Sequence, residues 1–294
     1  MKKIAVANLK GGVGKTSTAV ILADTLSALG GKRVLALDLD SQSNLSWALM
    51  SPSAFDDWPE AHSMKRWLDN LIDGKPSRLN ATLTNVSLQP DKSFFSSLWR
   101  DHITPKVNLA VAQPAMRFSE LSFEGPIHSE GAQNLSKHLN DCLAELSEQF
   151  DYCVMDCSPA LSALTRAGLQ AANHIVIPTP LNNLCLNSTN TFFDLALDKM
   201  LNVKANVYVV ATRVGRSAGN DEANEIRLAL ERGEQSGRWY RLDPEFKESV
   251  EYTRALNPPE LGPHQTLRSR YKSKIADLKK LLRSMIEKGL VEHE

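Results

Sequence analysis

One glycine-rich run near the start of the sequence constrains this chain more than any other feature: Lys10-Gly11-Gly12-Val13-Gly14-Lys15-Thr16-Ser17. The short apolar segment 3–8 before it is predicted to be a buried strand, and the segment 15–29 after it is predicted to be a helix. Glycines between a strand and a helix let backbone N–H groups curl around phosphate oxygens, and the helix N-terminus adds partial positive charge. The sequence therefore predicts a phosphate-binding loop.

The side chains of this run are those that a nucleotide phosphate requires. Lys15 is expected to contact the β- and γ-phosphates, and the hydroxyl group of Thr16 is expected to bind Mg²⁺. The predicted cofactors are therefore ATP and Mg²⁺, and the residues predicted to hold the nucleotide phosphates are Gly11, Gly12, Val13, Gly14, Lys15, Thr16 and Ser17.

Short apolar segments rich in β-branched residues recur along the chain, at 33–39, 107–112, 152–156, 174–178 and 207–212. Helical or loop sequence separates them, and the strand-loop-helix-strand order at the start is how parallel sheets are built. We therefore predict an α/β fold, a mostly parallel twisted sheet with helices on both faces. The chain is expected to form a single domain over residues 1–294, with a variable helical and loop region at about 51–130.

Acidic side chains close two of the predicted strands. Asp38 and Asp40 end the strand over 33–39, and alternation places them on one face at its carboxyl end, where ligands of open α/β sheets bind. Asp156 ends the apolar strand over 152–156, which has the form of a Walker B box. Asp156 is therefore predicted to hold Mg²⁺ through water.

A second lysine, Lys10, stands directly before the glycines, and the spacing of the glycines differs from that of the standard P-loop. In both respects the run resembles the deviant Walker A box of the ParA/MinD family of ATPases, which have a SIMIBI-like P-loop architecture. The resemblance implies that Lys10 reaches across a dimer interface to the nucleotide of the partner subunit, while Lys15 acts in cis. A homodimer that forms with ATP is therefore expected, because this cation meets the nucleotide only in the dimer.

The resemblance also covers the segment Asp38-Leu39-Asp40-Ser41-Gln42-Ser43-Asn44, where the family has a box of the form D-x-D-P-Q-G-N. It implies that Asp40 positions or activates the attacking water and that Asp38 supports the Mg²⁺ shell. Ser41 replaces the usual proline and Ser43 a frequent glycine, changes that affect the shape of the turn and remove no catalytic group.

The strand over 207–212 resembles the family's strand that approaches the adenine. Thr212 and Arg213, at its end, are therefore expected on the base side of the nucleotide. Together these roles imply a slow ATPase, activated by a partner protein, whose catalytic residues are Lys10, Lys15 and Asp40.

The end of the chain carries a basic amphipathic segment that is predicted to form a helix over about 269–288. Seven basic residues and one acid occur over 265–283, in a chain whose Lys plus Arg (34) equals its Asp plus Glu (34). Such a local patch can neutralise several DNA phosphates and makes binding sensitive to salt. The candidate DNA contacts are Arg268, Arg270, Lys272, Lys274, Lys279, Lys280 and Arg283.

Within the family, this patch favours a ParA-type partition or positioning ATPase. Such a protein binds non-specific double-stranded DNA as an ATP dimer, and a ParB-like or cargo-adaptor protein stimulates its hydrolysis. Its cargo is a plasmid, a chromosome or a protein assembly.

The alternative is a MinD-like membrane-associated ATPase that uses the terminal amphipathic helix as its anchor. The apolar face of the segment 269–288 holds no Phe or Trp, and the chain ends with Glu292 and Glu294, so a membrane partner is not expected. Relatives that carry a metal cluster need bridging cysteines; Cys157 lies near the right place after the Walker B box, but the region between Asp40 and Asp156 offers only Cys142. A small-molecule ligase of the dethiobiotin type is also disfavoured, since nothing in the sequence marks a substrate pocket.

The four cysteines, Cys142, Cys153, Cys157 and Cys185, form no C-x-x-C pair and suit the reduced thiols of a cytosolic protein. No apolar stretch approaches the length that spans a bilayer. We therefore expect a cytoplasmic protein that associates with the nucleoid in its ATP state.

Overall fold

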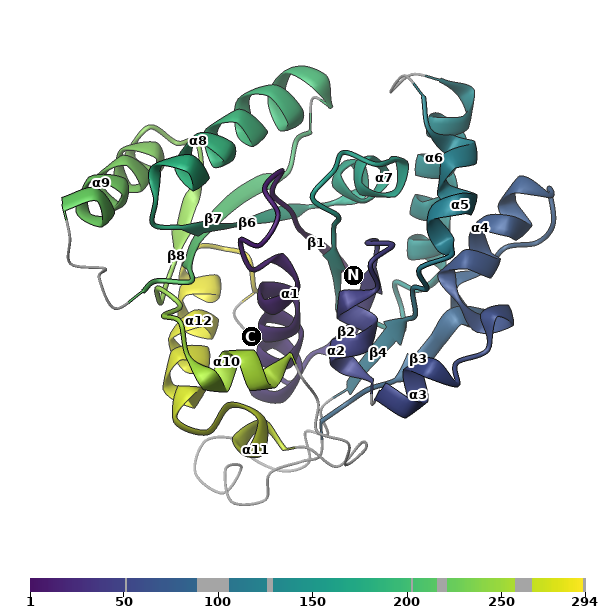
Figure 1. The fold of residues 1–294 in the computed structure, drawn as a ribbon, viewed down its shortest axis with the longest axis horizontal. Helices are drawn as coiled ribbons and strands as arrows, with labels where there is room; N and C mark the ends of the chain where they lie inside the picture. The colour runs from purple at the N-terminus through teal and green to yellow at the C-terminus, as the bar shows by residue number, and fades with distance from the viewer. Residues whose placement is uncertain are drawn as a thin grey trace.

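The computed structural model describes residues 1–50, 52–88, 106–125, 129–201, 203–215, 221–256 and 266–292. Within them lies an eight-stranded sheet of order β3-β4-β2-β5-β1-β6-β7-β8 (Figure 1). Neighbouring strands are parallel except β3 and β4, which are antiparallel. The strands are β1 (Lys2–Val6), β2 (Arg33–Asp38), β3 (Leu83–Asn85), β4 (Lys106–Ala110), β5 (Tyr152–Asp156), β6 (His174–Pro180), β7 (Asn206–Thr212) and β8 (Tyr240–Leu242).

Helices cover both faces of the sheet, which Figure 1 shows nearly edge-on. One face carries α4 (Met64–Ile72), α5 (Met116–Glu120), α6 (Glu130–Glu145), α7 (Ala163–Ala171), α8 (Asn183–Thr191) and α9 (Asp221–Gln235). The other face carries α1 (Lys15–Asp24), α2 (Asn44–Leu49), α3 (Pro52–Asp56), α10 (Val250–Ala255), α11 (Leu267–Tyr271) and α12 (Ile275–Glu287). The predicted α/β architecture is confirmed.

Two buried clusters, one on each face of the sheet, explain why the central strands are apolar throughout. In β1, Ala5 belongs to the cluster under α6 and α7, while Ile4 and Val6 belong to the cluster under α1 and α12. Because a parallel sheet is covered on both faces, alternate residues of a strand enter different cores and no polar face remains. The two strands that the sequence did not predict, β3 and β8, are three-residue edge strands.

The predicted variable region 51–130 consists, where it is described, of α3, α4, β3, β4, α5 and two short 3₁₀ turns, Glu60–His62 and Leu79–Thr82, followed by a third, Leu121–Phe123. Residues 51, 89–105 and 126–128 of that region lie outside the described residues. In the described parts of the chain, no helix combines the length and the apolar character of a membrane span. All four cysteines are buried, and none of them forms a disulfide.

The predicted helix over 269–288 is wrong in one respect, because the chain breaks it at Lys272. A capping box at Thr266 begins α11, a 3₁₀ turn over Lys272–Lys274 follows, and only then does α12 begin. Lys272 has a φ of 46°, which an α-helix does not allow. The buried hydroxyl of Tyr271 donates a hydrogen bond to Asp24 at 2.6 Å, and this anchor fixes α11 to the core before the chain turns into α12.

Candidate nucleotide-binding site

The predicted phosphate loop joins β1 to α1 at the carboxyl edge of the parallel strands (Figure 1). Gly12 and Gly14 have φ values of 73° and 95°, a region that other residues rarely adopt. Gly14 is also the N-cap of α1, and its carbonyl accepts a hydrogen bond from the amide of Thr18 at 2.9 Å. The first amides of α1 therefore face the loop, which is the arrangement that binds phosphate.

Both predicted lysines lie in this loop and are linked through one backbone group. The ammonium of Lys15 donates to the carbonyl oxygen of Lys10 at 3.1 Å, and the ammonium of Lys10 donates to Sγ of Cys185 on α8 at 3.3 Å. Lys15 is 8% exposed, and its burial lowers its pKa despite the opposing effects of Asp156 and Asp40. A buried cation beside two carboxylates makes this loop a strong site for a ligand of mixed phosphate and metal character.

The carboxyl ends of β2 and β5 bring the predicted acids together. Asp38 and Asp156 are register partners on these neighbouring strands. The hydroxyl of Thr16 donates to Oδ2 of Asp156 at 2.7 Å. Burial, followed by the charge of Asp38, raises the pKa of Asp156 well above its usual range. A cation at this point would offset the free-energy cost of ionising the buried Asp156, because it favours the ionised carboxylate.

The same residues pass a simple test for Mg²⁺. Oδ1 of Asp156 is buried and has no hydrogen-bond partner among the described residues, although Oδ2 is bonded to Thr16. No three His, Cys, Asp or Glu side chains within the described ranges form a metal cluster. Mg²⁺ rarely uses such a cage; it takes one or two protein ligands and completes its shell with water and substrate phosphates. A hydroxyl, one unsatisfied carboxylate oxygen and a phosphate loop therefore fit this ion.

Asp38, predicted to support the Mg²⁺ shell, is held by hydrogen bonds that the sequence did not reveal. Its Oδ2 accepts hydrogen bonds from the amide and the hydroxyl of Ser46 at 2.8 and 2.7 Å, and its Oδ1 accepts from the amide of Asp40 at 3.2 Å. Burial raises the pKa of Asp38 to about 7. These bonds tie β2 to the start of α2, so Asp38 supports the turn that carries Asp40. Ser46 had no recognisable signal, since a serine inside a short helix is an ordinary residue.

The loop opens into a cavity of about 1320 Å³ at the carboxyl edge of the sheet. Thr212 and Arg213 line it, and both bind the loop backbone: Thr212 donates to the carbonyl of Val13 at 2.7 Å, and Arg213 to that of Gly12 at 2.6 Å. They therefore hold the loop from the side predicted for the base. Much of the remaining wall was not predicted: part of it comes from α2 and α10, and part from a segment that pairs with Val214, namely Phe246, Lys247 and Glu248.

The basic residues at the chain end divide into exposed and buried groups. Arg268, Lys272, Lys280 and Arg283 are exposed, and Lys274 and Lys279 are half-buried. Arg270 is 5% exposed and lies 3.5 Å from Asp24, and it also donates to the carbonyl groups of Ala48 and Ala255. Its place among the candidate DNA contacts is therefore wrong. Helical periodicity did not reveal this, because the break at Lys272 gives α11 a different orientation from α12.

Replacing Arg270 by Ala should destabilise the protein by on the order of 3 kcal/mol, because it leaves Asp24 buried without its cation. Thermal unfolding of Arg270→Ala beside Arg268→Ala, an exposed neighbour, measures this difference. We expect a clear fall in the unfolding temperature for Arg270→Ala and little change for Arg268→Ala. Equal stability of the two variants would show that Asp24 does not depend on the ion pair.

A parallel sheet with a glycine-rich loop between its first strand and first helix, and an acid at the end of a neighbouring strand, defines a P-loop nucleotide-binding protein. A family model described as an AAA domain matches residues 1–204. The chain belongs to this family, and the resemblance to ParA/MinD ATPases that its motifs indicated is confirmed by the relatives below.

Two curated relatives are similar in sequence. The maintenance of carboxysome distribution protein A of Synechococcus elongatus is 28% identical over 262 residues, which cover 87% of this chain and 90% of that protein. The chromosome-partitioning ATPase Soj of Treponema pallidum is 32% identical over 177 residues, which cover 60% of this chain and 56% of that protein. Both are positioning or partitioning proteins, so the chain is similar to ATPases of that kind.

Solved structures share the fold over nearly the whole chain. The ATP complex of Cyanothece McdA has a TM-score of 0.71 at 22% identity, with 100% of this chain and 98% of that chain covered. The complex of pNOB8 ParA with nonspecific DNA has a TM-score of 0.65 at 20% identity, with 97% and 99% covered. At this level of identity the likeness establishes the architecture.

Proposed function

We propose that this chain is a ParA-type partition or positioning ATPase that binds ATP and Mg²⁺ at the loop over residues 10–17. The observation that carries the proposal is that a buried lysine, a hydroxyl and a carboxylate, those of Lys15, Thr16 and Asp156, meet at the loop that Lys10 begins. Curated relatives of this chain are a carboxysome-distribution protein and a chromosome-partitioning ATPase, which supports the same class.

In the proposed mechanism, each group in the cavity has one role. Lys15 and the amides at the start of α1 hold the β- and γ-phosphates, while Thr16 and Asp156 hold Mg²⁺, which supplies positive charge to the phosphate oxygens. Asp40 orients the attacking water, and Asp38 fixes the turn on which Asp40 lies. Thr212 and Arg213 maintain the loop from the base side.

We further propose that two such chains, each working as a single domain, close face to face with ATP. Lys10 of each chain then reaches the nucleotide of the other, and the charge it places there stabilises the transferred group. A partner protein of the ParB or cargo-adaptor kind stimulates hydrolysis and returns the chains to monomers. The cycle positions a plasmid, a chromosome or a protein assembly on the nucleoid.

The exposed and half-buried basic residues of α11, of the 3₁₀ turn after it and of α12 are the proposed contacts to non-specific DNA, namely Arg268, Lys272, Lys274, Lys279, Lys280 and Arg283. A structure of the same fold in complex with nonspecific DNA is known, which supports DNA as the proposed partner. The membrane alternative finds less support in the packing of α12. Leu278, Leu281 and Met285 are buried in the core, so a membrane would have to compete with the protein for the same apolar face.

Binding to a long duplex of arbitrary sequence, with ATP, with ADP and without nucleotide, tests the proposal directly. Tight binding with ATP alone, falling steeply as salt rises, is the expected result. Equal binding in all three states would show that DNA binding does not depend on the nucleotide. No binding in any state would exclude DNA as the partner. Vesicle sedimentation under the same conditions then tests the membrane alternative.

Alanine at three exposed positions, Lys272, Lys280 and Arg283, should weaken ATP-dependent DNA binding and flatten its salt dependence. Each lost phosphate contact reduces the magnitude of the slope of log K against log salt by about 1, so in the triple variant this magnitude should fall by about 3. A matched triple replacement of exposed cations elsewhere, at Arg66, Lys75 and Lys137, should leave the slope unchanged. Equal slopes for both triple variants would show that Lys272, Lys280 and Arg283 do not contact DNA.

A further inference from the structure

Two segments flank the phosphate loop at the carboxyl edge of the sheet, and neither contains Asp, Glu, Lys or Arg. They are residues 157–165, which follow β5, and residues 181–193, which follow β6. Both strands pair with β1, so the loop that follows β1 emerges between the two segments. Since 23% of the residues of this chain are charged, the lack of charge on both sides of the loop distinguishes this edge.

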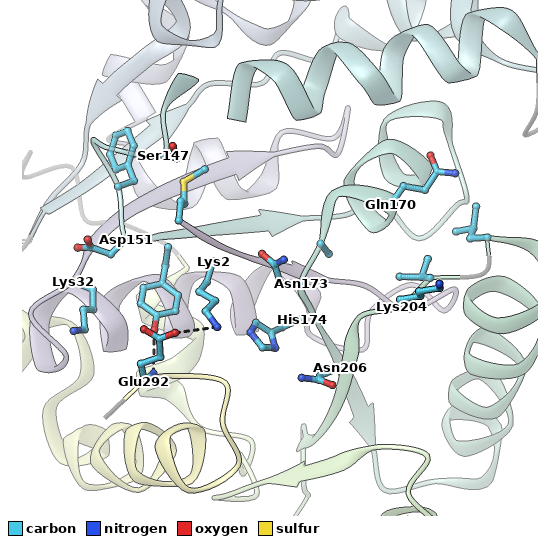
Figure 2. A pocket seen from close by; sticks show the side chains of 16 residues that line it. Lys2, Lys32, Ser147, Asp151, Gln170, Asn173, His174, Lys204, Asn206 and Glu292 are labelled. Atoms are coloured by element: carbon cyan, nitrogen blue, oxygen red, sulfur yellow. Dashed lines mark hydrogen bonds and ion pairs between the residues drawn. The ribbon is translucent and has the colours of Figure 1, made fainter. Parts of the chain in front are cut away.

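The amino edge of the same sheet has the opposite character. A cavity of about 990 Å³ at that edge is lined by Lys2, Lys32, Asp151, Lys204 and Glu292, and Figure 2 shows these side chains spread around it. Charged groups are costly to remove from water, whereas apolar groups and hydrogen-bonded amides are not. Of the two edges, the one beside the phosphate loop is therefore the one that suits burial against another protein.

Leu184, in the first turn of α8, is the large apolar side chain that this edge exposes to water. It is 73% exposed, whereas its neighbours Leu181 and Leu186 are partly buried and pack against the core. Pro159 and Ala160, on the other side of the loop, are exposed as well. We define the neutral surface as the exposed residues within 157–165 and 181–188, namely Pro159, Ala160, Asn183, Leu184 and Asn187.

Lys10 is bound to α8 beside this surface. Its ammonium donates to Sγ of Cys185, the residue after Leu184, at 3.3 Å. Its amide donates to Oδ1 of Asn8 at 3.2 Å, and the same oxygen accepts from the hydroxyl of Ser188 on α8 at 2.9 Å. A partner chain whose nucleotide receives Lys10 therefore comes into contact with the first turns of α8.

The lack of charge favours a second copy of this chain as the occupant of the neutral surface. A two-fold dimer brings the same patch of both chains together, so charged side chains near its axis would face like charges. A neutral surface avoids this repulsion, and the cores of interfaces are depleted in charged residues. At the edge of the neutral surface, Glu222 of α9 accepts from the amide of Asn183 at 3.1 Å, which gives the surface a polar rim.

We propose that the neutral surface is the apolar contact of the ATP dimer, and that Leu184 of each chain is buried against the other chain. This inference rests on the ATP dimer proposed above. It assigns the apolar contact of that dimer to residues that bind neither nucleotide nor DNA, and it places this contact directly beside Lys10.

Sedimentation velocity with Mg²⁺ and a non-hydrolysable ATP analogue tests the contact in a Leu184→Ser variant. Each dimer loses two leucines, and we expect its Kd to rise about 100-fold, equivalent to about 2.8 kcal/mol. Leu228→Ser, which changes a leucine that is 54% exposed on α9, should dimerise as the parent chain does. Leu184→Met, which keeps a large apolar side chain, should dimerise nearly as tightly.

ATP affinity and the unfolding temperature should be unchanged in all three variants, because Leu184 is exposed and lies outside the lining of the nucleotide cavity. Loss of ATP affinity in Leu184→Ser would assign this residue to the nucleotide site and overturn the proposal. Dimerisation of Leu184→Ser as tight as that of the parent would overturn it too, while leaving the ATP dimer in place.

Hydrogen exchange of the backbone amides of residues 181–188 provides a second measurement, which needs no substitution. With the analogue bound, exchange should slow at protein concentrations above the Kd of the parent dimer and not below it. Equal exchange at both concentrations in a chain that dimerises would exclude this surface from the interface. A parent chain that remains monomeric with the analogue would instead refute the ATP dimer itself, and this contact with it.

Discussion

A Lys15→Gln variant should lose ATP binding by at least about 1,000-fold, which corresponds to about 4 kcal/mol. The glutamine side chain is slightly shorter than that of lysine and should keep the packing of the loop, but it carries no charge. Lys15 is the buried cation of this loop, and Asp156 and Asp40 close by would otherwise repel a triphosphate. Calorimetric titration of ATP with Mg²⁺ into the purified variant measures the loss.

An unchanged unfolding temperature for Lys15→Gln would establish that the loss concerns the ligand and not the fold. Lys137→Gln, an exposed change on α6, should bind ATP as the parent chain does. If Lys15→Gln bound ATP within tenfold of the parent, the loop could not be the phosphate site, and the mechanism proposed from it would be wrong.

A Lys10→Ala variant should bind ATP nearly as tightly as the parent chain and yet fail to dimerise with it. The side chain of Lys10 points away from its own phosphate loop, toward Cys185 on α8, so the nucleotide of the same chain does not depend on it. The proposed dimer does depend on it, because Lys10 supplies the positive charge across the interface. Sedimentation velocity with a non-hydrolysable ATP analogue, beside an ATP titration, separates the two effects.

The contact with Cys185 provides the control. Cys185→Ala removes the thiol that Lys10 touches but keeps the ammonium, so this variant should still dimerise with the analogue. A Lys10→Ala variant that dimerised as the parent does would exclude the role in trans. Loss of ATP binding in the same variant would instead assign Lys10 to the nucleotide of its own chain.

The parts of the site that the sequence predicted are those in which a local rule fixes the geometry. A left-handed turn before a helix requires glycine, so Gly12 and Gly14 were recognisable as a loop. Strand alternation placed Asp38 and Asp40 at the carboxyl end of one strand and Asp156 at the carboxyl end of another, and the structure makes Asp38 and Asp156 register partners. Apolar runs predicted the six longer strands, since a strand that is buried on both faces of a sheet is apolar along its whole length.

The missing parts depend on contacts between segments far apart in the chain. Ser46 and Glu248 reach the site because α2 and the segment after β8 pack there, and neither residue differs from an ordinary surface serine or glutamate in sequence. Arg270 looked like its exposed neighbours, and only the buried Asp24, far earlier in the chain, explains its position. The edge strands β3 and β8 were missed because three residues are too few to show a period.

The return of the C-terminal segment to the amino edge has a practical consequence for fusion proteins. After α12, the chain turns at Gly289 and the amide of Glu292 donates to the hydroxyl of Tyr152, the first residue of β5, at 3.4 Å. A fluorescent protein or affinity tag fused beyond this point would be attached on the side of the sheet remote from the phosphate loop. Such a tag would leave the phosphate loop, at the opposite edge of the sheet, unobstructed for nucleotide and DNA titrations.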